Sequence, residues 1–135
     1  AWAIAQTLKV FTCIWAEGKP DWSKIVGPGG MPSSHSAFVT SIAVGVGIQE
    51  GWNSALFAVT VGFALVVMYD AAGIRRAAGE HAQVLNQLIE RAFREGYLES
   101  TKLRELLGHT PLEVAMGAFL GIVVSWLMIG WALKG

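Results

Sequence analysis

The sequence has few charged residues, and this scarcity excludes several classes of protein. Asp, Glu, Lys and Arg make up 15% of the 135 residues, whereas soluble globular domains average about 25%. The ten basic and ten acidic side chains cancel, so no excess of positive charge favours a nucleic-acid partner. The single cysteine, Cys13, excludes an internal disulfide framework, and no Cys/His cluster has zinc spacing. We therefore expect neither nucleic acid nor a metal to be bound.

What the sequence does contain is apolar. Hydrophobic residues make up 53% of the chain and the mean hydropathy is +0.48. The 16 glycines would allow close helix contacts, and the six tryptophans suit a membrane interface. A chain of this length forms one domain, residues 1–135. The composition predicts an all-α, polytopic membrane bundle.

Four apolar stretches are candidates for transmembrane helices: Ala1–Trp15, Ser36–Ile48, Ala55–Tyr69 and Val114–Leu133. A full crossing takes about 20 apolar residues, and the fourth stretch alone meets that length cleanly. The second and third read as a helical hairpin around a tight turn at 49–53. The first begins abruptly without Met, which we interpret as a truncated first helix. We predict about four transmembrane helices.

The segment between the third and fourth stretches, 70–109, is richer in charge. Apolar residues recur in it at helical spacing: Val84, Leu85, Leu88, Ile89, Ala92 and Phe93. This pattern predicts an amphipathic helix that lies on the membrane or against the bundle. A second short helix is expected at 100–107.

Basic residues indicate the orientation. If all four stretches cross, eight of the ten Lys and Arg residues fall on the side that carries 16–35 and 70–109. The positive-inside rule then places that side in the cytoplasm. His35, Arg75, Arg76, His109 and Glu113 would all meet at this face, although they are far apart in sequence.

The first candidate motif is the glycine- and serine-rich segment Gly27–Ser36, which leads into a helix. Free N–H groups at a helix N-terminus form an anion site, and the serine hydroxyls, such as those of Ser33 and Ser34, could cap the helix. His35 could donate to a bound oxyanion or pass a proton to a leaving oxygen. The alternative is a capped turn with an incidental histidine.

The second motif places Asp70 before the adjacent arginines Arg75 and Arg76. Guanidinium groups bind phosphate bidentately, and Asp70 could orient one of them. The alternative is ordinary anchoring of a helix end at the membrane.

The third motif contains His109 and Glu113, four residues apart at the start of the last crossing. A carboxylate beside an imidazole fixes its tautomer and makes it a better base or nucleophile. The alternative is a capped helix start in which Glu113 favours the N-terminus. Lys9 is a further candidate, because an ammonium in an apolar helix faces a polar interior or an anion unless it snorkels to the interface.

Two of these motifs resemble those of a known protein family. Pro32-Ser33-Ser34-His35-Ser36 is similar to the Pro-Ser-Gly-His motif of the type-2 phosphatidic acid phosphatases, relatives of the vanadium haloperoxidases. Gly108-His109-Thr110-Pro111-Leu112-Glu113 resembles the final motif of that family, in which Asp follows His by four residues. The whole chain most resembles a short, divergent branch of this superfamily in bacteria and plastids.

The resemblance implies a metal-independent phosphatase without a cofactor, embedded in a bacterial inner membrane or a plastid membrane. His109 would attack phosphorus, Glu113 would orient it, and His35 would protonate the leaving alcohol. The phosphoryl oxygens would be held by Ser33, Ser34 and Lys9.

The chain also departs from the family pattern. Ala16-Glu17 stands where the first motif has Arg-Pro, Leu103 stands where the third has Arg, and Ser34 replaces Gly. Our hypothesis is that Arg75 and Arg76 replace the missing arginines.

Two functions remain open at this point. One is hydrolysis of a lipid phosphate such as phosphatidate, phosphatidylglycerophosphate or a polyprenyl pyrophosphate. The alternative is a non-catalytic membrane scaffold that binds lipid phosphates; a transporter subunit and a haloperoxidase have less support. The bilayer is a partner in either case, and glycines in the helices favour a homodimer.

Overall fold

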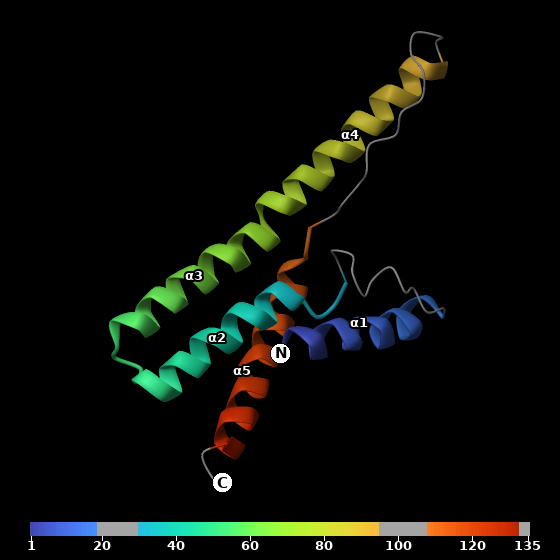
Figure 1. Cartoon of the computed structure of the whole chain (residues 1–135). Helices are drawn as coiled ribbons and strands as arrows, with labels where there is room; N and C mark the ends of the chain where they lie inside the picture. Colours follow the sequence, from blue (N-terminus) through green and yellow to red (C-terminus); the bar gives the residue numbers. More distant parts are fainter. Residues whose placement is uncertain (19–29, 95–107, 133–135) are drawn as a thin grey trace.

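The computed structural model describes residues 1–18, 30–94 and 108–132, and all the regular structure in these ranges is helical. The helices are α1 (Trp2–Glu17), α2 (Ser34–Glu50), α3 (Ala55–Ala72), α4 (Ile74–Arg94) and α5 (Pro111–Ala132) (Figure 1). The all-α prediction is confirmed for these ranges. The short helix expected at 100–107 lies outside the described residues.

Serine caps define the predicted α2–α3 hairpin. The Ser33 hydroxyl accepts from the amide of Ser36 at the start of α2, and the Ser54 hydroxyl accepts from the amide of Phe57 at the start of α3. Such caps satisfy amides that have no partner within the helix. Helix α2 ends at Glu50 and is followed by Gly51, whose φ of 92° suits glycine. The two helices are thus joined by a short turn, as predicted.

Helix α5 packs closely along α2. A Cβ atom at Gly117 would overlap the Ser33 carbonyl, and one at Gly121 would overlap the Thr40 hydroxyl and the Ala37 carbonyl. The absence of side chains at these two positions brings the backbones together, as in small-residue membrane interfaces. The Thr40 hydroxyl also donates to the Ala118 carbonyl at 3.2 Å.

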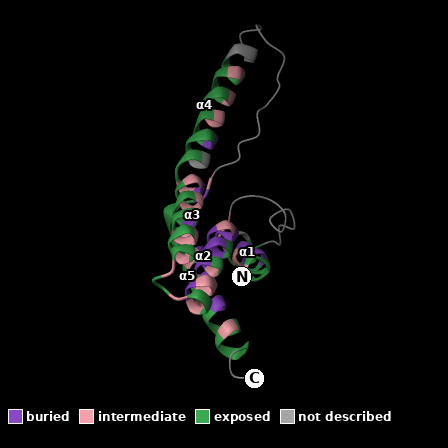
Figure 2. Cartoon of the chain, turned by 60° about the vertical axis from the view of Figure 1, so that its left-hand side comes forward, coloured by how far each residue is buried: buried purple, intermediate pink, exposed green. Residues whose placement is uncertain are grey.

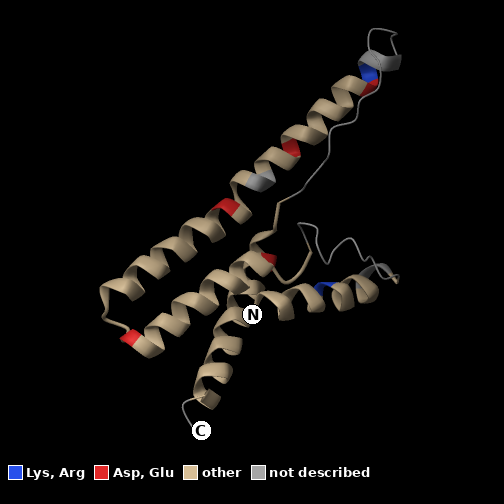
Figure 3. Ribbon diagram, in the orientation of Figure 1, with Lys and Arg blue, Asp and Glu red and all other residues tan. Residues whose placement is uncertain are grey.

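The outer surface of the helices is apolar. Exposed side chains include Val66 on α3, and Leu127 and Trp131 on α5, at 68%, 68% and 83% exposure, and Figure 2 shows exposed residues along both helices. Charged residues on these two helices are confined near the ends, at Asp70 and Glu113 (Figure 3). This is the pattern of helices that face lipid.

The described residues contain two segments long and apolar enough to span a membrane, Ala55–Arg91 and Pro111–Ala132. Helices α1 and α2, with 16 and 17 residues, are shorter than the roughly 20 residues that a full crossing takes. Two spans are therefore supported by length, and the expectation of four remains a prediction.

Helix α4 follows α3 after the single residue Gly73 and extends away from the other helices (Figure 1). Among the described helices it contacts α3 alone. The expected amphipathic helix is therefore present, but packing against the bundle, one of its two predicted placements, is not observed.

Candidate functional site

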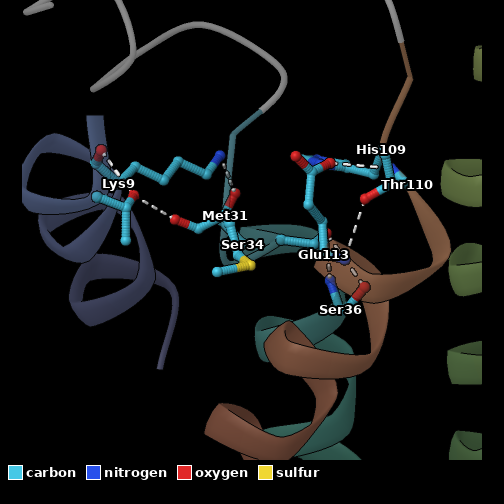
Figure 4. A network of polar contacts seen from close by, with 9 residues as sticks. Lys9, Met31, Ser34, Ser36, His109, Thr110 and Glu113 are labelled. Carbon is cyan, nitrogen blue, oxygen red and sulfur yellow. Dashed lines mark hydrogen bonds and ion pairs between the residues drawn. The ribbon is translucent and has the colours of Figure 1, made fainter. Parts of the chain in front are cut away.

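Three segments distant in sequence meet at one place: the middle of α1, the start of α2 and the start of α5 (Figure 4). The close approach of α5 at Gly117 to Ser33 holds the two helix starts together. The candidate residues of the first and third motifs are therefore neighbours.

The serines at the start of α2 are buried. Ser33, Ser34 and Ser36 are 0%, 2% and 0% exposed. The Ser36 hydroxyl donates to the Ser33 hydroxyl at 3.1 Å, and the Ser33 amide donates to the Glu113 carbonyl at 3.0 Å. The second of these bonds fixes α2 directly to the first turn of α5.

Lys9 points into the protein from α1. Its side chain is 2% exposed and its Nζ donates to the Ser34 hydroxyl at 3.2 Å. One turn further along α1, the Thr12 hydroxyl donates to the Met31 carbonyl at 2.6 Å. The positive charge of Lys9 is thus buried at the helix start where an anion is expected, rather than exposed on the protein surface.

Glu113 has two roles at the start of α5. Its Oε2 lies 3.2 Å from Nδ1 of His109 and accepts from the Thr110 amide at 2.9 Å. The Glu113 amide faces the Thr110 hydroxyl at 3.3 Å, which completes a capping box. The motif is therefore both a capped helix start and a carboxylate–imidazole pair, because the Glu113 carboxylate caps α5 and also contacts the His109 ring.

The two histidines of the site face one another. The rings of His35 and His109 are edge to face, with centroids 6.2 Å apart and planes at 62°. His109 is 3% exposed, whereas His35 is half-buried. The His109 amide donates to the Ala71 carbonyl at 3.1 Å, so the end of α3 also borders the site.

The second motif is only partly placed by the structure. Asp70 is half-buried on the last turn of α3, next to Ala71. Arg75 and Arg76 lie in the first turn of α4, but their side chains lie outside the described part of the chain. Their contact with the site therefore remains a prediction.

Sequence reasoning passed over two residues that the structure brings into the site. Thr12 lies three residues after Lys9, on the same face of α1, and this spacing could have marked it. Ser36 was read as part of a helix start, whereas it also holds the Ser33 hydroxyl. The contact between Thr12 and the Met31 carbonyl had no signal in the sequence.

Comparisons with known proteins identify the family of the chain. The family model described as "Divergent PAP2 family" matches residues 1–124. The uncharacterized membrane protein YuiD of Bacillus subtilis (strain 168) is 41% identical over 138 aligned positions, which cover 92% of this chain and 85% of the relative. No solved structure gives a significant match.

Proposed function

The chain belongs to the divergent PAP2 family of membrane proteins, and from this premise we propose that it hydrolyses the phosphate ester or pyrophosphate of a membrane lipid. The observation that carries the proposal is the pair of histidines, 6.2 Å apart, with Glu113 on Nδ1 of His109 and Lys9 at the adjoining helix start. Two imidazoles, an orienting carboxylate and a buried cation together suit phosphoryl transfer.

In the first step, Nε2 of His109 attacks phosphorus, because Nδ1 faces Glu113. The phosphorus–oxygen bond to the lipid breaks, a bond from phosphorus to Nε2 forms, and His35 gives its proton to the leaving oxygen. The Glu113 carboxylate stabilises the positive charge that develops on the His109 ring. Lys9, with the capped helix start at Ser33 and Ser34, stabilises the phosphoryl oxygens.

In the second step, water attacks the phosphohistidine and His35 accepts its proton. Inorganic phosphate leaves and His109 is restored. A phosphomonoester yields a lipid alcohol, and a pyrophosphate yields a lipid monophosphate. These steps use side chains alone, as the family resemblance implies.

A lipid is the substrate class that fits the surroundings of the site. Helix α2, which carries His35, and helix α5, which begins two residues after His109, expose apolar side chains, so acyl or prenyl chains can remain in the bilayer while the headgroup reaches the polar residues. We assign the site to the cytoplasmic face of the membrane from the distribution of basic residues. We also expect the chain to form a homodimer, which crosslinking in native membranes would detect.

The departures from the family pattern favour a second candidate function, a scaffold that binds lipid phosphates without turnover. Ser34 stands where the family has Gly, and its hydroxyl contacts Lys9. Phosphate release in detergent separates the two candidates. The substrates are phosphatidate, phosphatidylglycerophosphate and undecaprenyl pyrophosphate, without added metal. Release from one of them supports the phosphatase, whereas binding without release supports the scaffold.

Glu113→Gln should lower turnover by about 10²- to 10⁴-fold without unfolding the protein. Glutamine can still cap α5 through the Thr110 amide, but a neutral amide does not stabilise a cationic imidazole. Turnover and the thermal midpoint should be measured together. Full activity in a stably folded variant would remove Glu113 from the mechanism.

Arg75→Ala and Arg76→Ala should each reduce turnover by about 10²-fold or more, if these residues supply the charge of the missing family arginines. The matched control is Arg91→Ala, an exposed arginine near the other end of α4. Initial rates of phosphate release should be compared among the three variants. Near-normal rates for both Arg75→Ala and Arg76→Ala would contradict the hypothesis that these residues replace the missing arginines.

A further inference from the structure

Helix α4 carries an exposed apolar strip that no part of the proposed site uses. Its large members are Ile74, Val84, Leu85 and Leu88, at 61%, 56%, 48% and 54% exposure. Their spacing places them on one side of the helix. The polar residue His81 lies on the same side of α4, one turn before Leu85.

The opposite side of α4 is polar. Glu80, Gln87, Glu90 and Arg91 are all exposed. Gln87 and Glu90 lie about 100° or more around the helix from Leu85 and Leu88, whereas Glu80 and Arg91 border the strip beside Val84. This two-sided character distinguishes α4 from α3 and α5, which are apolar around their outer surfaces. It is typical of helices that lie in the plane of a membrane interface.

The length of the continuous helical segment shows that α4 cannot share the bilayer core with α3. Ala55–Arg91 contains 37 residues and is therefore about 55 Å long, against a hydrocarbon core of about 30 Å. Helix α3, with 18 residues, is about 27 Å long and covers most of that thickness on its own. Helix α4 therefore begins where the bilayer ends.

The junction between the two helices is irregular. Gly73 has φ of −104° and ψ of −77°, away from the usual helical values near −63° and −42°. A straight continuation would hold the apolar strip in water. A bend at Gly73 would bring the strip onto the surface of the bilayer that α3 crosses.

We propose that α4 is a membrane-surface helix: it turns at Gly73, inserts Ile74, Val84, Leu85 and Leu88 into the lipid interface, and leaves Glu80, Gln87 and Glu90 in water. The bilayer is the occupant of this face because α3, a candidate span, is joined to α4 by one residue. That short connection keeps the strip at the interface.

The test uses an environment-sensitive fluorophore on single cysteines in a Cys13→Ser background. Leu85→Cys and Leu88→Cys report on the strip, and Gln87→Cys, on the neighbouring polar side, is the matched control. The labelled proteins are reconstituted in phosphatidylcholine–phosphatidylglycerol vesicles at a low protein-to-lipid ratio. Aqueous iodide and a lipid with a nitroxide near its headgroup serve as quenchers.

Labels at Leu85 and Leu88 should emit at shorter wavelength than the label at Gln87, and iodide should quench them several-fold less. The lipid-borne nitroxide should quench them more. Equal iodide quenching at all three positions would overturn the proposal. So would protection that grows with the protein-to-lipid ratio, because a second copy of the chain would then cover the strip. The readout needs no enzymatic activity, so it is independent of the proposed phosphatase function.

Discussion

Replacing His109 with Asn should reduce phosphate release by about 10³-fold or more, the largest loss of activity that we expect from any single substitution. The reason is that His109 forms the covalent bond to phosphorus, and a phosphohistidine cannot form on an amide side chain. Lys9 and the start of α2 are unchanged in this variant, so the lipid phosphate should still bind. Initial rates and binding should be measured on the same preparation.

A stability control is needed for this variant because His109 is buried. The His109 amide bond to Ala71 and the Thr110–Glu113 capping box do not depend on the imidazole, so α5 should still begin correctly. The thermal midpoint should therefore fall only modestly. Retained turnover in His109→Asn would show that another residue is the nucleophile.

Gly117→Ala and Gly121→Ala should produce the largest losses of stability. A methyl group at Gly117 would overlap the Ser33 carbonyl, and one at Gly121 would overlap the Ala37 carbonyl. These neighbours are backbone atoms, which move only if the helices separate. We expect each substitution to cost about 1–3 kcal/mol, as overpacking does in protein cores, and Gly117→Ala should also lower activity by displacing Ser33.

The matched controls are Gly62→Ala and Gly130→Ala, since a Cβ atom at either position has no neighbour within 4 Å. Both lie on helices, so alanine should leave the thermal midpoint unchanged or raise it slightly. Thermal unfolding in detergent compares the four variants. Equal midpoints for all four would contradict the close packing of α5 on α2.

Local signals in the sequence predicted much of the fold. The α2–α3 hairpin was expected because two short apolar stretches flank a tight turn. The turn at 49–53 was expected because polar residues and Gly51 interrupt the apolar pattern. Apolar spacing in 84–93 likewise predicted α4.

The placement of α4 could not be predicted, because periodicity identifies an apolar face but not what covers it. The four crossings were inferred from composition, whereas α1 and α2 are too short to count as spans by length alone. The length of a helix depends on where its backbone hydrogen bonds end, and the hydropathy of the sequence does not specify that position.

The local pairing of His109 with Glu113 could be predicted from their spacing, but the contacts between distant segments of the candidate site could not. The approach of His35 to His109, and the burial of Lys9 against Ser34, depend on α5 packing on α2 at Gly117. Such packing is a tertiary property, and the hydrogen bond from Ser33 to the Glu113 carbonyl joins residues 80 apart. The predicted topology had placed His35 and His109 at one membrane face, but it did not specify their contacts.

The central claim is tested most directly by trapping the covalent intermediate. Wild-type protein would be mixed with the lipid phosphate that supports release, quenched in alkali to preserve phosphohistidine, digested and analysed by mass spectrometry. We predict one phosphoryl group on the peptide that contains His109, and none on the peptides that contain His35 or His81. Phosphate release with no phosphoryl group on His109, or with the group on another residue, would contradict the account.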